Sequence, residues 1–313
     1  MKKPASVFLL LAICFVCSAQ EKQEKFNVGG TPSNAAAVTQ ILGKVYHELP
    51  ENQKVLIGNG LYFHAQCEEP FASIGGAYGP EDDPDYKYPD KNLYPTGTIK
   101  VNICPYSMDL FSIANKTDDP VTAFVFEKLS LELFVHEIKH VEQYRENPVV
   151  ALSKEDDCGK KYATICDPDK LEGTKTKMYY ELAALRLGHE LGPNKITAEQ
   201  WTHAQAWLAN HKELITPRIA GIEKMTHEQL QRTDIGELFY SAIYVPIILA
   251  QQCKSGGKLN EMQIQYGFNV FELEDQSENS LTKGYPYLKN VFKELAPCLI
   301  VERESNKIPS QTT

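Results

Sequence analysis

The sequence contains no apolar run long enough to cross a membrane, no C-x-x-C pair and no basic stripe. The apolar stretches at 7–16 and 239–250 are both shorter than the roughly 20 residues that a membrane-spanning helix needs. Without C-x-x-C spacing, a structural zinc site made of four cysteines is not expected. The formal net charge of −9 argues against a nucleic-acid-binding protein. Repeats and low-complexity segments are absent too, and 42% hydrophobic residues allow a chain of 313 residues to bury a core.

Residues 1–19 have the character of a cleavable secretory signal peptide. Lys2 and Lys3 form a charged start, the apolar run at 7–16 follows, and small residues lead up to Ala19. We expect cleavage after Ala19 and a secreted or periplasmic product.

Of the eight cysteines, two lie in this leader, and an even number remains in the mature chain: Cys67, Cys104, Cys158, Cys166, Cys253 and Cys298. An even count in an exported protein favours disulfides. We expect at least two, one of them between Cys158 and Cys166, which flank a short polar segment. The alternative is free, buried cysteines.

A long helix is expected from about residue 120 to residue 146. Asp119 suits the N-cap position and Pro120 suits the first helical position. Apolar residues then recur at spacings of three and four, and Asn147 with Pro148 ends the helix. The apolar stripe comprises Val121, Phe124, Val125, Leu129 and Leu133, and it continues through two histidines.

These histidines belong to the motif H-E-I-K-H at residues 136–140. His136 and His140 are four residues apart and share one helix face, so both imidazoles can reach one metal ion. Zn²⁺ suits two neutral imidazoles, a third protein ligand and a water. Glu137 lies beside them and can accept a proton from that water. The alternative is a core helix whose histidines hydrogen-bond to their neighbours.

With Gln143 the motif reads H-E-x-x-H-x-x-Q and resembles the zincin metallopeptidases. A metzincin would have Gly at 143 and His at 146, where this chain has Gln143 and Glu146. The resemblance is therefore to the gluzincins, in which a Glu on a later helix completes the site. It implies one Zn²⁺ per chain and a peptide or protein substrate.

The resemblance also implies an α+β, zincin-like fold in a single domain at 20–313. We expect an N-terminal α/β lobe at about 20–147, with an edge strand at the cleft, and a mainly helical C-terminal lobe at 148–303. The polar tail at 304–313 follows. The strand expected at 97–103 is our candidate for the edge strand that borders the cleft, and a plain core strand is the alternative.

Glu181 is the expected third ligand. It lies in a predicted helix at 178–188, where Ala184 and Gly188 fall on or near the same face and would allow close approach to the first helix. The segment resembles the E-x-x-A stretch of gluzincins, although Leu185 stands where thermolysin-like members have Asp. Competing ligands are Asp169, Glu172 and His189. Glu137-x-x-His140 also matches half of a di-iron motif, but the chain contains no second E-x-x-H unit.

Other elements are expected from local signals. A helix is predicted at 33–48, and the β-prone segments 55–57 and 61–63 around Gly58-Asn59-Gly60 predict a hairpin. A long loop is predicted at 75–97. Two further helices are predicted, one at 197–214 opened by a capping box and one at 235–252 that contains Pro246.

Together these expectations describe a secreted zinc-dependent metallopeptidase. His136, His140 and Glu181 would bind zinc, and Glu137 would act as general base. The alternative is a non-catalytic secreted binding protein that retains the zincin scaffold. Candidates for stabilising the oxyanion are Tyr180, His189, His203, His211 and Tyr240.

Overall fold

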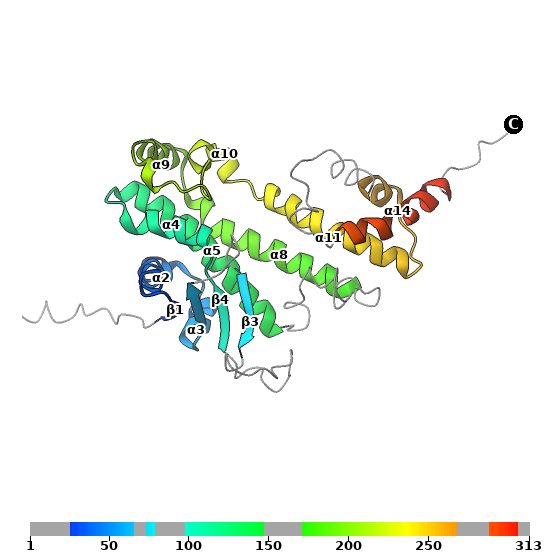
Figure 1. Cartoon of the computed structure of the whole chain (residues 1–313), viewed down its shortest axis with the longest axis horizontal. Helices are drawn as coiled ribbons and strands as arrows, with labels where there is room; N and C mark the ends of the chain where they lie inside the picture. The colour runs from blue at the N-terminus through cyan, green and yellow to red at the C-terminus, as the bar shows by residue number, and fades with distance from the viewer. Residues whose placement is uncertain (1–25, 66–72, 79–97, 147–170, 268–287, 306–313) are drawn as a thin grey trace, which may run out of the picture.

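The computed structural model describes residues 26–65, 73–78, 98–146, 171–267 and 288–305 (Figure 1). The predicted signal peptide, the pair Cys158 and Cys166, Asp169 and most of the polar tail lie outside these residues. The described residues form an α+β fold that is mostly helical, with one small sheet.

The sheet has four strands in the order β1-β2-β4-β3. Strands β1 (Asn27–Gly30), β2 (Tyr62–Ala65) and β4 (Thr98–Asn102) are parallel, and β3 (Ser73–Tyr78) runs antiparallel to β4. Parallel neighbours need a crossover connection, and between β1 and β2 the chain forms α2 (Pro32–Val45), the 3₁₀ turn η1 (Tyr46–Glu48) and α3 (Glu51–Gly58). The helix predicted at 33–48 is therefore confirmed as α2 and η1.

The predicted hairpin around Gly58-Asn59-Gly60 is wrong, because residues 55–57 belong to helix α3. Leu56 and Ile57 are buried together with Gln53, whereas Val55 is 60% exposed. This pattern of burial has a helical period. The helix also includes the polar residues 51–54 before this segment. The Gly-containing segment ends α3: the Asn59 N–H bonds to carbonyls of the last turn, and Gly60 follows with a φ of 91°.

The predicted strand at 97–103 is present as β4, but its proposed place at an edge of the sheet is wrong. β4 lies between β2 and β3, and β3 is the edge strand on this side of the described sheet. β3 overlaps the start of the segment that we expected to be a loop. Its register shifts between Ile74 and Ala77, where Gly75 and Gly76 interrupt the strand pattern.

Helix α5 (Pro120–Glu146) has the predicted start and end. Asp119 caps it, because the Thr122 N–H donates to Asp119 Oδ1 at 2.7 Å. Along its length the helix packs against α4 (Pro105–Lys116), α2 and strands β3 and β4. It is the central element of the larger hydrophobic core.

That core joins the sheet to helices from both halves of the chain. Phe134 of α5 makes a T-shaped contact with Phe63 of β2 and stacks on Phe111 of α4. Trp201 of α9 (Ala198–Asn210) is buried in the same cluster. The core therefore includes residues on both sides of residue 147, where we expected one lobe to end. The capping box predicted at the start of α9 is confirmed by the reciprocal bonds of Thr197 and Gln200.

The second half of the described chain is helical. Its long helices are α8 (Leu171–Leu191), α11 (Asp234–Lys254), which contains Pro246 as predicted, and α14 (Leu288–Ser305). Shorter elements complete it: η3 (Pro193–Lys195), η4 (Lys212–Leu214), η5 (Ile222–Lys224) and α10 (His227–Leu230). In Figure 1, α8 begins near α11 and α14 and runs towards the sheet-containing end of the molecule, where its last turns lie against α5.

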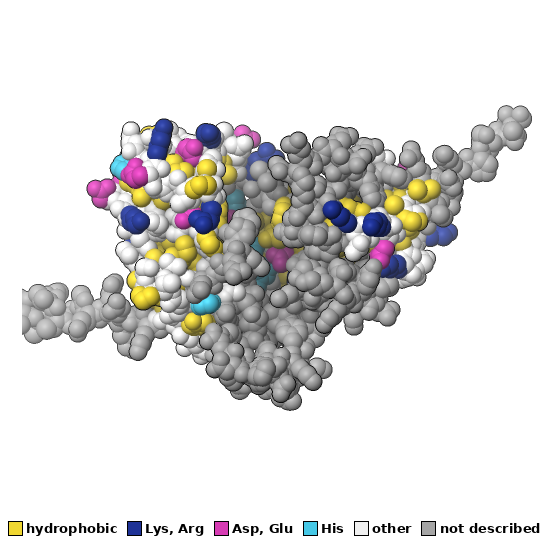
Figure 2. Space-filling model, in the orientation of Figure 1, with side chains coloured by type: hydrophobic (Ala, Val, Ile, Leu, Met, Phe, Trp, Pro, Cys, Tyr) yellow, Lys and Arg dark blue, Asp and Glu magenta, His cyan; other side chains and the backbone are white. Residues whose placement is uncertain are grey.

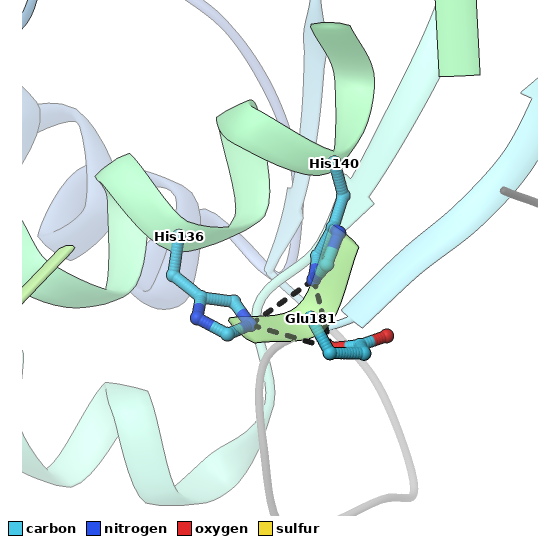
Figure 3. A group of neighbouring side chains, drawn as sticks. All are labelled: His136, His140 and Glu181. Atoms are coloured by element: carbon cyan, nitrogen blue, oxygen red, sulfur yellow. Dashed lines mark hydrogen bonds and ion pairs between the residues drawn. The ribbon is translucent and has the colours of Figure 1, made fainter. Parts of the chain in front are cut away.

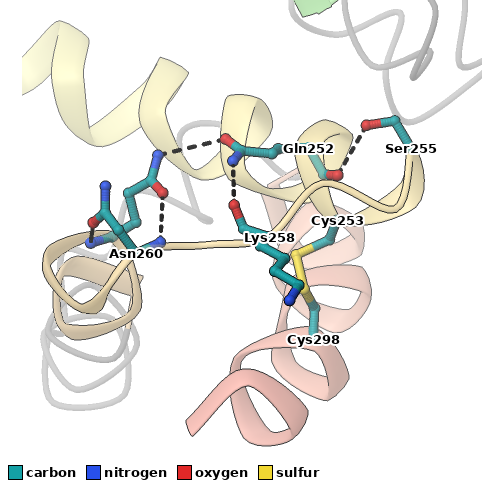
Figure 4. Close-up of a disulfide and its surroundings, with 7 residues drawn as sticks. Gln252, Cys253, Ser255, Lys258, Asn260 and Cys298 are labelled. Carbon is teal, nitrogen blue, oxygen red and sulfur yellow. Dashed lines mark hydrogen bonds between the residues drawn. A yellow bond between two sulfur atoms is a disulfide. The ribbon is translucent and has the colours of Figure 1, made fainter. Parts of the chain in front are cut away.

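A disulfide between Cys253 and Cys298 joins α11 to α14, with Cα atoms 6.1 Å apart (Figure 4). These helices enclose a second, smaller core that includes Ile247, Leu288 and Leu295. Cys104 at the start of α4 is also disulfide-bonded. Within the part of the chain that the structure describes, no helix has the length and apolar character needed to cross a membrane.

Candidate metal centre

Three predicted ligands, His136 and His140 of α5 and Glu181 of α8, converge on one point (Figure 3). The Nε2 atoms of His136 and His140 are 3.1 Å apart. Glu181 Oε2 lies 3.2 Å from His140 Nε2 and 3.9 Å from His136 Nε2. The helical spacing of four places the two imidazoles together, and the packing of α8 on α5 brings the carboxylate to them.

These separations fit a common metal ion. Ligand atoms about 2.1 Å from a tetrahedral ion lie roughly 3.4 Å from one another. The observed range of 3.1 to 3.9 Å brackets that value. The donor set of two imidazole nitrogens and one carboxylate oxygen is also the set found in catalytic zinc sites that keep an open position. The residues present therefore fit a Zn²⁺ ion.

Small residues on α8 make this arrangement possible. A Cβ atom at Gly188 would be 2.8 Å from the Glu132 backbone oxygen and 3.5 Å from His136 Cβ. At Gly192, which directly follows the end of α8, it would be 2.7 Å from the Lys128 backbone oxygen. Ala184 is fully buried between these positions and Glu181. Close approach of the two helices thus depends on residues without bulky side chains.

Gln143 of α5 contacts both His140 on its own helix and the backbone of α8, a role that the sequence pattern did not reveal. Its side-chain oxygen lies 2.7 Å from His140 Nδ1, and its amide nitrogen donates to the Tyr180 backbone oxygen at 2.9 Å. The signal in the sequence was the final Q of H-E-x-x-H-x-x-Q. It placed Gln143 near His140 but could not show a contact with a residue 37 positions away.

Burial and mutual charge strongly perturb the three groups in the metal-free protein. Burial, together with the neighbouring His140, lowers the pKa of His136 to about 3. Burial also acts to lower the pKa of His140, but the charge and hydrogen bond of Glu181 outweigh it and raise that pKa to about 9. Burial raises the pKa of Glu181, but the charge and hydrogen bond of His140 lower it by more, and the resulting pKa is about 2. One proton is therefore held between His140 and Glu181 at neutral pH.

Two further charged residues belong to this environment. Glu137 is buried, and its charge contributes to the raised pKa of His140, so its carboxylate is close to that imidazole. Lys177 is buried one helical turn before Glu181, and its charge helps to lower the pKa of Glu181. Sequence reasoning identified Glu137 but not Lys177, although the spacing of four to Glu181 was available as a signal.

The competing ligands that the structure describes do not join the cluster. His189 Nδ1 lies 3.2 Å from Glu132 Oε1, one turn along α5 from His136. Glu172 is exposed and pairs with Lys175. Asp169 is outside the described residues. Among the described His, Cys, Asp and Glu side chains, the cluster of His136, His140 and Glu181 is the one group whose ligand atoms lie close enough together to hold a metal ion.

The structure also separates the oxyanion candidates. His203 bonds to Asp119 at the start of α5, on the order of 25 Å along the helix from His136. His211 stacks on Trp207, with ring centroids 3.8 Å apart. Tyr180 directly precedes Glu181, and Tyr240 packs against a small apolar cluster that Met178 of α8 also contacts. Tyr180 is thus adjacent to Glu181 in the sequence, and Tyr240 packs in a cluster shared with α8.

Comparisons with protein-family models, with curated proteins and with solved structures found no match for this chain. On the face shown in Figure 2, Lys and Arg side chains are scattered among acidic and apolar ones rather than gathered in a stripe.

Proposed function

We propose that the protein is a zinc-dependent metallopeptidase of the gluzincin type. The observation that carries the proposal is the convergence of His136, His140 and Glu181, from two helices, beside the buried Glu137. The charges support it as well. Zn²⁺ would balance the two carboxylates of Glu137 and Glu181, and buried charges need such compensation.

Zinc held by His136, His140 and Glu181 would polarise the scissile carbonyl and make a water molecule more acidic. Glu137 would accept the proton from the attacking water and then deliver it to the leaving nitrogen. Its position one residue after His136, on the helix that carries both imidazoles, suits it for both transfers. Tyr180 or Tyr240 would donate a hydrogen bond to the developing oxyanion.

The substrate proposal concerns an extended peptide. β3 is an edge strand of the described sheet and contacts α5, the helix that carries the motif. An extended chain can add to such an edge through backbone hydrogen bonds. We therefore place the substrate along β3, in the role that sequence reasoning gave to the strand at 97–103.

Export is part of the proposal. The charged and apolar start of the sequence has the form of a signal peptide, and the disulfide between Cys253 and Cys298 is typical of proteins from oxidising compartments. The second candidate function is a non-catalytic secreted binding protein with a zincin scaffold. The buried Glu137 beside His140 favours the peptidase, because a binding protein has no need of a base there.

Zinc content and peptide cleavage, measured on the same preparation, test the proposal. We expect about one zinc per chain, and cleavage of a peptide library that stops on chelation and returns with added zinc. Bound zinc without cleavage of any peptide would favour the binding protein. Cleavage that a chelator leaves unchanged would rule out the zinc mechanism.

A further inference from the structure

Gln143 makes two hydrogen bonds that face different helices. It is 2% exposed and lies three residues after His140 on α5. Its oxygen is 2.7 Å from His140 Nδ1, and its nitrogen is 2.9 Å from the Tyr180 oxygen on α8. Tyr180 is the residue directly before Glu181. A single buried side chain thus contacts one imidazole of the cluster and the backbone next to its carboxylate.

The Tyr180 contact determines which way the amide of Gln143 faces. A backbone carbonyl can only accept a hydrogen bond, so the NH₂ group must face it. The amide oxygen must then face His140, and an oxygen there requires a proton on Nδ1. The other ring nitrogen, Nε2, is the atom that lies 3.2 Å from Glu181. A proton held on Nδ1 leaves the Nε2 lone pair of the neutral imidazole directed into the cluster.

We infer that Gln143 is a positioning residue that makes Nε2 the metal-binding atom of His140 and holds the His140 ring in place for Glu181. A histidine that binds a metal through one ring nitrogen commonly donates the N–H of its other ring nitrogen to a fixed acceptor. Here the acceptor is an amide whose orientation is set by α8, the helix of the third ligand. The inference rests on the proposed zinc centre, but it does not depend on peptide hydrolysis.

Gln53 offers a matched control. It is also a buried glutamine, and its amide nitrogen donates to a backbone oxygen of α5, that of Val135, at 3.0 Å. Val135 directly precedes His136 in α5. The Gln53 oxygen, however, has no hydrogen-bond partner among the residues that the structure describes. Loss of Gln53 removes a buried amide that braces α5 but leaves the Nδ1 contact of His140 intact.

The experiment measures zinc dissociation constants, by chelator competition, for the wild type, Gln143→Met, Gln143→Glu and Gln53→Met. Gln143→Met has a similar volume but no acceptor, and we expect roughly 10–100-fold weaker binding, as for other groups that orient a metal ligand. Gln143→Glu keeps an acceptor for His140 and should bind zinc more tightly than Gln143→Met. Gln53→Met should stay within about threefold of the wild type, because only a generic packing interaction is lost.

NMR of the zinc-loaded protein, labelled with ¹⁵N at histidine, supplies a readout that core packing alone would not change. The wild type should show His140 with a protonated Nδ1 and a metal-bound Nε2, and its Nδ1 proton should exchange slowly. In Gln143→Met that slow exchange should be lost.

Three results would overturn the inference: wild-type affinity in Gln143→Met, an equal loss in Gln53→Met, or an equal loss in Gln143→Glu. A wild-type protein that binds no zinc would overturn both this inference and the zinc centre. If the zinc measurements come out as expected but no peptide is cleaved, the peptidase proposal fails and the role of Gln143 stands.

Discussion

Gly188 of α8 lies against Glu132 of α5 so closely that a Cβ atom would be 2.8 Å from the Glu132 backbone oxygen. Backbone cannot move aside as a flexible side chain can, so the helices would have to separate. Because Glu132 is one turn before His136, the separation would occur next to the cluster of His136, His140 and Glu181. The small residue thus links helix packing to the geometry of the site.

We expect Gly188→Ala to weaken zinc binding by about tenfold or more and to destabilise the protein by about 1–3 kcal/mol, the usual cost of overpacking. Gly43→Ala is the control. A Cβ atom at Gly43 in α2 would meet no atom within 4 Å, so this variant should be neutral or more stable by about 0.5–1 kcal/mol. Chemical denaturation and chelator competition measure the two effects. Unchanged zinc affinity in Gly188→Ala would show that the helix spacing does not control the site.

Replacing Glu181 with Ala removes one of three proposed ligands. Zinc affinity should fall by more than about tenfold while the fold largely survives. Glu172→Ala, on the same helix but exposed and paired with Lys175, should bind zinc like the wild type. Titration of the metal-free proteins with zinc makes the comparison. Wild-type affinity in Glu181→Ala would remove Glu181 from the ligand set.

Zinc binding should release about one proton per ion between pH 7 and 8. In the metal-free protein Glu181 raises the pKa of His140 to about 9, while that of His136 is about 3, so the cluster carries one exchangeable proton at neutral pH. Zinc must displace it. The zinc affinity should therefore fall by about tenfold for each pH unit below 9, because protons compete with zinc for His140.

Calorimetry in buffers with different heats of ionisation counts the released protons. Zero protons released at pH 7.5 would contradict the charge distribution described for the cluster. A second proton would have to come from His136 or from a zinc-bound water, which zinc makes more acidic.

Asp119 should stabilise the helix that carries the motif. The Thr122 backbone N–H and His203 lower its pKa from 3.8 to about 2. A carboxyl group whose pKa is lowered in the folded protein stabilises the fold at pH values above its pKa in the unfolded chain, which is near 4. This contribution disappears as the pH falls towards 2. Asp119→Ala should cost about 0.5–2 kcal/mol at pH 7, the usual cost of losing an N-cap.

Urea denaturation at pH 7 and pH 2.5 measures this difference, with the exposed neighbour in Asp118→Ala as control. The gap between Asp119→Ala and the wild type should shrink at the lower pH. A gap of equal size at both values would mean that the carboxylate charge is not what caps α5.

The elements that sequence reasoning located correctly are those with local signals. Asp119 and Pro120 mark the start of α5, and the spacing of four brings His136 and His140 together within one helix. Thr197 and Gln200 form the predicted capping box within a single turn. Each of these signals involves residues that are close in the sequence. Their local spacing is therefore sufficient to predict the helix or cap that they form.

The elements that it missed depend on contacts between distant residues. Residues 55–57 have high β-propensity, yet α3 is helical because its buried face packs on α5. The position of β4 inside the sheet depends on β3, which the Gly-rich pattern did not predict. The hydrogen bond from Gln143 to Tyr180 joins two helices and could not be inferred from either one alone.

The most direct test of the account is the substitution Glu137→Gln. The amide has nearly the shape of the carboxylate and leaves His136, His140 and Glu181 in place, so zinc should still bind at about one ion per chain. An amide cannot accept a proton at neutral pH, and peptide cleavage should therefore fall by at least ~10²–10⁴. The measurement is cleavage of a peptide library by wild type and variant, with zinc determined in parallel. A variant that retains its zinc and cleaves as fast as the wild type would contradict the account.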